Sequence, residues 1–268
     1  MTQRLIVTLV VCLLSSFAAG EGQLRLTSTT STQDSGLLDI LLPVFEQATG
    51  YRTKVFAVGT GAALRMGRKG QADVLLVHAP EAEQQFVEEG HGLARHLIMH
   101  NDSVVVGPPS DPAALSGLDD SAQALRRIWD QQALFISRGD DSGTHRKELK
   151  LWTAAHLDPY GAPWYRELGF NMADALRAAS KQSAYTVTDR GTWLALRQEL
   201  NLKIVVQGDP LMKNLYTAIG VNPERHPDIN AAAGSAFIDW LRSPAAQRLI
   251  GNYRKHGEVL FVPRLAAE

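Results

Sequence analysis

The sequence predicts an α/β protein in which mostly parallel sheets are flanked by helices. Apolar segments with strand patterns are followed by segments of helical periodicity along the chain after residue 20. Residues 72–77 form a near-continuous apolar run, as in a parallel strand that is covered on both faces. Three polar segments also occur where a strand gives way to a helix. Because ligands of such sheets bind at the carboxyl ends of strands, these segments are candidate binding loops.

The first candidate loop is a run of hydroxyl residues at 28–32. It follows a short strand that includes Leu24 and Leu26, and it precedes a predicted helix that ends at Gly50. Such runs are also common in solvated loops, with Ser35 as the cap of the next helix. The candidate anion ligands in this loop are Thr29, Thr30 and Ser31.

The second candidate loop follows an alternating strand at 52–58. Thr60 supplies a hydroxyl, and Gly61 lets a ligand approach the main chain at a helix start. A tight turn explains the glycines equally well. The dinucleotide fingerprint does not fit, because Leu64 stands where its third glycine is required.

The third candidate loop, residues 137–146, lies between an apolar strand and a helix that starts near residue 147. A helix start offers free N–H groups and the positive end of the helix dipole, which favour an anion. Arg138 adds a planar set of donors. The alternative is an ordinary helix start, with Asp141 or Ser142 as N-cap and Arg138 paired with Asp140. The candidate ligands in this loop are Arg138, Ser142, Gly143 and Thr144.

Histidines outside these loops are expected to be structural. His78 follows the strand at 72–77 and could face a ligand, although a hydrogen-bonded structural role is the more common one. His91, His96 and His100 have no evident further ligand, so no metal site is predicted. Asp189 and Arg190 are expected to form a structural ion pair or a latch between lobes, more than a ligand contact.

The first twenty residues are predicted to be a secretory signal peptide, with an uncleaved membrane anchor as the alternative that the short apolar segment disfavours. Arg4 precedes a short apolar core, and small residues end at Gly20, where cleavage is expected. Cys12, the chain's one cysteine, could carry a lipid tether, but Val10 and Val11 are larger than lipoprotein processing prefers. The mature chain would therefore be secreted and would lack disulfides.

Charge excludes several classes of partner. The whole chain of 268 residues carries a net charge of −1, with 27 basic and 28 acidic residues. It has neither the basic excess that nucleic acid requires nor a lysine-rich tract for anionic lipid. An anion would have to be held by local donors.

Two lobes are predicted, because two segments of the sequence are suited to carry the chain from one lobe to the other. A proline-rich segment after residue 107 is a candidate for the first crossing, and residues 215–221 can carry the chain back. This gives lobe 1 from residues 21–106 and 216–268, and lobe 2 from residues 107–215.

The three loops together resemble those of the periplasmic tungstate-binding proteins of ABC importers. The similarity runs through 28–38, 59–61 and 137–145, and extends to 73–80 and 185–192. Ser28 stands where this family usually has a threonine. The resemblance implies a two-lobed type II periplasmic binding protein with a ligand cleft between the lobes. It also implies Arg138 and Thr144 as second-lobe contacts to the anion.

The expected function is capture of tungstate, with molybdate as a second ligand, and delivery to an ABC permease and through it to the ATPase subunit. We expect a monomer without catalysis, cofactor or resident metal. The alternatives are a phosphate- or sulfate-binding protein of the same fold, a sensor, or a secreted hydrolase with Ser142 as nucleophile and His145 or His78 as base. The hydrolase has weak support, since Ser142 and His145 are one turn apart and no nucleophile-elbow motif is present.

Overall fold

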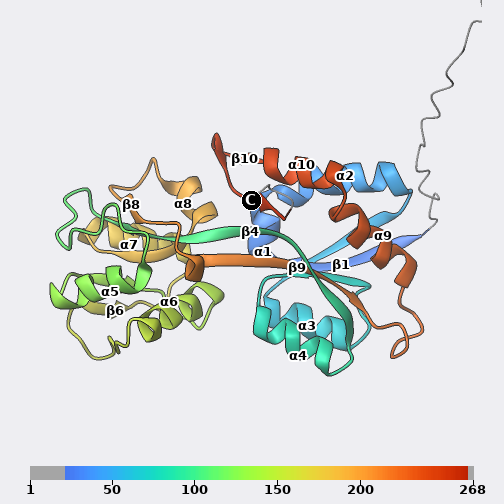
Figure 1. Cartoon of the computed structure of the whole chain (residues 1–268), viewed down its shortest axis with the longest axis horizontal. Helices are drawn as coiled ribbons and strands as arrows, with labels where there is room; N and C mark the ends of the chain where they lie inside the picture. The colour runs from blue at the N-terminus through green and yellow to red at the C-terminus, as the bar shows by residue number, and fades with distance from the viewer. Residues whose placement is uncertain (1–21, 265–268) are drawn as a thin grey trace, which may run out of the picture.

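The computed structural model describes residues 22–264, which form two lobes joined by long strands (Figure 1). The predicted signal peptide and Cys12 lie outside these residues. Within residues 22–264, no helix has the length and apolar character needed to cross a membrane.

Lobe 1 is built on a mixed sheet whose strand order is β12-β4-β9-β3-β1-β2. Its strands are β1 (Gln23–Thr29), β2 (Arg52–Val58), β3 (Val74–Val77), β4 (Gly92–Gly107), β9 (Lys213–Val221) and β12 (Val262–Pro263). Its helices are α1 (Thr30–Ser35), α2 (Leu37–Thr49), α3 (Thr60–Arg68), α4 (Pro80–Glu88), α9 (Ala231–Leu241) and α10 (Pro244–Asn252). The strands β10 (Arg254–Lys255) and β11 (Glu258–Val259) form a small hairpin beside it.

Lobe 2 is formed around the carboxyl-terminal part of β4. Residues 103–107 of that strand pair with β7 (Thr186–Asp189) on one side and β8 (Lys203–Val206) on the other. A parallel pair, β5 (Phe135–Ser137) and β6 (Tyr165–Glu167), lies beside them. The helices are α5 (Ser121–Asp130), α6 (Gly143–Ala154), α7 (Met172–Gln182) and α8 (Arg190–Leu196), and a 3-10 turn, η1 (Pro210–Met212), leads into β9.

The two-lobed α/β architecture is confirmed, but the expectation of mostly parallel pairing is wrong. β1 pairs in parallel with β2 and β3, whereas β4 and β9 run antiparallel to each other and to their other neighbours. β4 and β9 extend from one lobe toward the other (Figure 1). By strand pairing the chain changes lobe within β4, before the proline-rich segment after residue 107. The exact lobe boundaries stay a prediction.

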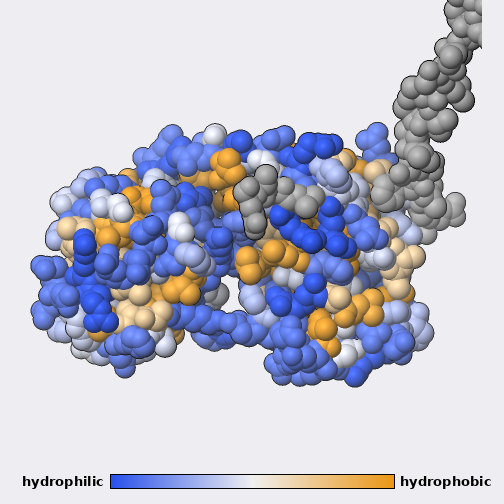
Figure 2. All heavy atoms as spheres, viewed as in Figure 1, coloured by the Kyte–Doolittle hydropathy of each residue, from blue (hydrophilic) through white to orange (hydrophobic). Residues whose placement is uncertain are grey.

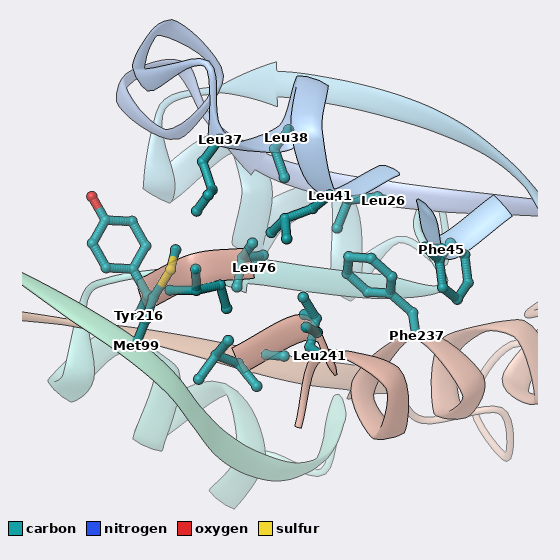
Figure 3. Close-up of a cluster of buried hydrophobic side chains, with 14 of the residues drawn as sticks. Leu26, Leu37, Leu38, Leu41, Phe45, Leu76, Met99, Tyr216, Phe237 and Leu241 are labelled. Carbon is teal, nitrogen blue, oxygen red and sulfur yellow. The ribbon is translucent and has the colours of Figure 1, made fainter. Parts of the chain in front are cut away.

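The main core lies in lobe 1 between α2, α9, α10 and the sheet (Figure 3). α2 has apolar residues at helical spacing and lies between Gly36 and Gly50, which both adopt positive φ. Phe45 of α2 packs edge-on against Phe237, with ring centroids 5.0 Å apart. Lobe 2 has cores of its own, one centred on Phe135 and Trp152. Each lobe therefore has its own packed interior.

Candidate oxyanion-binding site

Thr29 lies at the junction of β1 and α1 and is at the centre of the hydrogen bonds of the first loop. It is the N-cap of α1, and its hydroxyl accepts a hydrogen bond from the backbone N–H of Thr32 at 3.3 Å. The same oxygen lies 3.1 Å from the Ser31 hydroxyl and 2.7 Å from the Thr32 hydroxyl. Thr30 and Ser31 are exposed in the first turn of α1, whereas Thr29 is buried. The predicted loop is thus a strand end followed by a short helix.

The second loop lies next to the first because of strand register. Thr29 at the end of β1 pairs with Val58 at the end of β2, so α1 and α3 begin side by side. Thr60 is the first residue of α3, and Gly61 is exposed in its first turn. A Cβ added at Gly59 would meet nothing within 4 Å, so the approach to this helix start is open. The structure places Thr29, Ser31, Thr60 and Gly61 at neighbouring strand ends of lobe 1, and their role as anion donors stays a prediction.

His78, for which a structural role is predicted, joins the hydroxyls of the first loop. It follows β3, which pairs with β1, and its Nε2 lies 3.1 Å from the Thr29 hydroxyl and 3.3 Å from the Ser31 hydroxyl. Its Nδ1 lies 3.1 Å from Oδ1 of Asn214 on β9. The signal that could have found it is its place after a strand that neighbours the hydroxyl-bearing one.

Arg138 of lobe 2 is held in place by Asp140. Arg138 Nη2 donates to Asp140 Oδ2 at 2.5 Å, and the backbone N–H of Ser142 donates to Asp140 Oδ1 at 3.2 Å. Arg138 Nε is buried and has no hydrogen-bond partner within the described chain. Although burial acts to raise the pKa of Asp140, hydrogen bonds from Ser142 and the charge of Arg138 bring it below its ordinary value. Asp140 is therefore a carboxylate whose two oxygens are both engaged.

Ser142 starts α6, and the residues after it are accessible. Its Oγ accepts from the backbone N–H of His145 at 3.3 Å, as an N-cap does. Gly143 is exposed and Thr144 is half-buried, and helix geometry leaves their N–H groups without partners inside the helix. A Cβ at Gly143 would again meet nothing within 4 Å. The third loop therefore presents amides, a hydroxyl and a guanidinium together.

The capping contacts of the alternative interpretation are thus present: Ser142 caps α6 and Arg138 pairs with Asp140. Within residues 22–264 these contacts do not involve the N–H groups of Gly143 and Thr144, so they are compatible with anion binding. The binding role of Arg138, Ser142, Gly143 and Thr144 stays a prediction.

The ring of His145 contacts residues other than Ser142. Its Nδ1 accepts from the backbone N–H of Asp141 at 3.0 Å, and its Nε2 lies 3.6 Å from Glu167 Oε1. His78 belongs to the hydroxyl network of the other lobe. A nucleophile requires a base within hydrogen-bond reach, so the pairing that a Ser142 hydrolase would need is not formed in this arrangement.

Side chains of lobe 2 contact the two strands that connect the lobes, β4 and β9, or the turn that leads into β9. Lys147 of α6 donates from Nζ to the backbone oxygens of Leu211 and Lys213, at 3.1 and 2.9 Å. Arg190 of α8 makes two 2.6 Å hydrogen bonds to the carboxylate of Asp102 on β4. Asp189 instead caps α8 through Thr192, so Asp189 and Arg190 do not pair with each other.

Comparison with known proteins agrees with this architecture. The family model of the PBP superfamily domain matches residues 18–245. The tungstate-binding protein TupA of Peptoclostridium acidaminophilum is 49% identical over 250 residues, covering 92% of this chain and 87% of that protein. The solved structure of TupA from Desulfovibrio alaskensis G20 has a TM-score of 0.89 at 42% identity, covering 91% of this chain and 99% of that one.

A solved structure described as the tungstate ABC transporter from Geobacter sulfurreducens is 43% identical with a TM-score of 0.76, covering 86% of this chain and 98% of that one. Together these matches place the protein in the class of periplasmic binding proteins with the two-lobed type II fold. More narrowly, the chain belongs to the family of the tungstate-binding protein TupA.

Proposed function

We propose that this protein captures tungstate in the periplasm, with molybdate as a second ligand, and delivers it to the permease of an ABC importer. The observation that carries the proposal is the composition of the third loop. There, one guanidinium and the start of α6 present donors, while the nearby carboxylate of Asp140 is engaged by Arg138 and Ser142. The names of its relatives support the same ligand.

The chemistry of the donors favours a fully ionised dianion. Tungstate, molybdate and sulfate need hydrogen-bond donors only, whereas phosphate keeps a proton near neutral pH and is held best where an acceptor is present. The lobe 1 donors are the hydroxyls of residues 29–31, Thr60 and the amide of Gly61. Asp140 accepts hydrogen bonds from Arg138 and Ser142, so we assign this carboxylate the role of orienting the loop and not that of accepting a phosphate proton. The donors do not distinguish tungstate from molybdate, and the preference for tungstate is proposed from the family relationship.

Binding would proceed by closure of the lobes over the anion. Lobe 1 offers residues 29–31 and 60–61, lobe 2 offers residues 138–144, and an anion that contacts both stabilises the closed form. The closed protein would then bind the permease and act through it on the ATPase subunit. We expect a monomer that needs no cofactor besides its transported anion, and no catalytic step.

Calorimetry on the mature protein with tungstate, molybdate, sulfate and phosphate tests the proposal. We expect tungstate to bind most tightly, molybdate next, and phosphate without measurable heat. Binding of phosphate in preference to tungstate would overturn the proposal in favour of a phosphate-binding protein. Binding of sulfate alone would assign the site to sulfate, because the donor set would be right and the size selection wrong.

A further inference from the structure

His78 connects the hydroxyls of the first loop to both strands that join the lobes. On one side Nε2 faces Thr29 and Ser31 at 3.1 and 3.3 Å. On the other side Nδ1 faces Asn214 Oδ1 on β9, and Asn214 donates from Nδ2 to Asn101 Oδ1 on β4 at 3.1 Å. A single imidazole thus lies between the proposed anion ligands and the connection between the lobes.

The Asn214 contact determines the tautomer of neutral His78. Asn214 uses its Nδ2 to donate to Asn101, so its Oδ1 faces His78 and can only accept. Nδ1 of His78 must therefore carry the hydrogen. In the neutral ring Nε2 is then an acceptor, and it takes a hydrogen from the hydroxyl of Thr29 or Ser31.

An oxyanion at the first loop needs the same hydrogens. Each hydroxyl has one hydrogen, and the anion can only accept. While Nε2 is an acceptor, one hydroxyl of the pair is directed toward the imidazole and is lost to the ligand. If Nε2 carries a proton, it donates to a hydroxyl oxygen, and neither Thr29 nor Ser31 has to direct its hydrogen toward the ring.

We propose that His78 is a positioning residue that takes up a proton from solvent when the oxyanion binds, so that Nε2 changes from acceptor to donor. The step forms one N–H bond on the ring, and the buffer supplies the proton. It also places a positive charge beside the dianion. The inference rests on the proposed function, because it requires an anion at residues 29–31.

The surroundings of His78 suit such a change. Burial lowers the pKa of His78 in the absence of a ligand, and the charge of Lys147 on α6 acts in the same direction. The hydrogen bond with Asn214 on β9 favours the charged ring, and so does the charge of Asp189, the last residue of β7. Tyr216 of β9 lies with its ring centroid 4.7 Å from that of His78 and stays neutral, since burial raises its pKa. A bound dianion would favour the protonated ring.

The test is titration calorimetry of the mature protein with tungstate in several buffers of different ionisation enthalpy, between about pH 6.5 and about pH 8.5, where the histidine charge can change. We expect an uptake of up to one proton per anion. Affinity should rise as the pH falls, by at most about tenfold per pH unit for a single proton. The measurement uses the unaltered protein, so it does not depend on the folding of a variant.

The His78→Gln variant should bind with an affinity that no longer depends on pH and without proton uptake. His96→Gln is the matched control, since His96 lies elsewhere on β4 near Arg242 and Asp239 and its loss should leave the uptake unchanged. Tungstate binding with a heat that is independent of the buffer overturns the role of His78 and leaves the proposed function intact. Absence of binding to any oxyanion contradicts the proposed function and this inference together. Should another oxyanion bind instead, the same proton measurement with that anion decides the role of His78.

Discussion

Arg138 combines a fixed position with unused hydrogen-bonding capacity. Its side chain is 16% exposed and paired through Nη2 with Asp140, while Nε is buried without a partner within residues 22–264. A buried donor left unsatisfied costs about 1 to 3 kcal/mol, which an acceptor brought by a ligand would recover. We expect Arg138→Ala to weaken tungstate binding by about 1.5 to 3 kcal/mol, the range for hydrogen bonds to charged groups, as measured by calorimetry.

Arg166→Ala is the control for that variant. Arg166 also belongs to lobe 2, and it donates a hydrogen bond to Gln182 Oε1. Its substitution therefore removes the same positive charge at a position outside the candidate site. Unchanged affinity in Arg138→Ala would remove Arg138 from the ligand set. An equal loss in both variants would assign the effect to the net charge of the lobe.

Glu148 should make the protein less stable as the pH rises. Burial between Trp152 and Tyr165 raises its pKa from 4.5 to about 7, although both side chains donate hydrogen bonds to it. The folded state then holds a proton that the unfolded chain releases above about pH 4.5, so the free energy of unfolding falls between about pH 4.5 and 7. At pH 8 the ionised, buried carboxylate costs about 3 kcal/mol.

The Glu148→Gln variant should lose most of this pH dependence, because the amide keeps an acceptor and does not ionise. Urea unfolding at pH 5 and pH 8 measures the change in the free energy of unfolding. Glu199→Gln is the control, at an exposed position of the same lobe. If the variant and the natural protein fall equally in stability between the two pH values, Glu148 is not the group responsible.

At the scale of elements, local pattern predicted the strand and helix junctions well. The starts of α3 and α6 follow from glycine, hydroxyl and apolar spacing, and both were expected within a few residues. The turn of helix at 30–35 was expected as a loop, since its hydroxyl residues have low helix propensity. It forms because Thr29 caps it and Gly36 ends it in a left-handed conformation. His78 was missed as a site residue because its partners Thr29 and Asn214 are distant in sequence.

Gly139 allows the third loop to approach β6. It has a φ of 61°, and an added Cβ would lie 2.7 Å from Cβ of Glu167. Gly139→Ala should therefore displace the segment that carries Arg138 and lower both the melting temperature and the anion affinity. Gly169, with a φ of 67° and open space around it, is the control.

Gly169→Ala has the same left-handed backbone strain, about 1 to 2 kcal/mol, without the clash. It should lower the melting temperature and leave the affinity unchanged. Equal loss of affinity in the two variants would mean that strain in lobe 2, and not displacement of the loop, weakens binding.

At the scale of the molecule, the antiparallel course of β4 and β9 could not be predicted from local pattern. A buried strand has the same apolar composition whichever way its neighbours run, and pairing between residues such as Val105 and Val187 is set by the whole fold. The consequence is functional, because the strands that form the sheets also connect the lobes. Residues of β4 near Asp102 and of β9 near Lys213 are therefore where relative motion of the lobes has to be accommodated.

The lobes also meet along one edge through charged side chains. Lys150 of α6 and Glu81 of α4 form an ion pair of 2.5 Å, and both side chains are mostly exposed. Figure 2 shows hydrophilic atoms bridging the lobes along this edge, below an opening through the molecule. An exposed ion pair contributes at most about 1 kcal/mol. Because this pair joins the two lobes, that energy favours the arrangement in which they are close together.

Reversing one charge tests this contact. Glu81→Lys places two positive charges across the edge and should weaken tungstate binding by about two- to tenfold, since like charges oppose the approach of the lobes. The double variant Glu81→Lys with Lys150→Glu restores an opposite pair and should recover the affinity, which makes it an internal control. The loss in the single variant should shrink in high salt, because exposed charges are screened. If the double variant binds as weakly as the single one, the ion pair between Lys150 and Glu81 does not contribute to closure of the lobes. Closure would then depend on the connecting strands β4 and β9 alone.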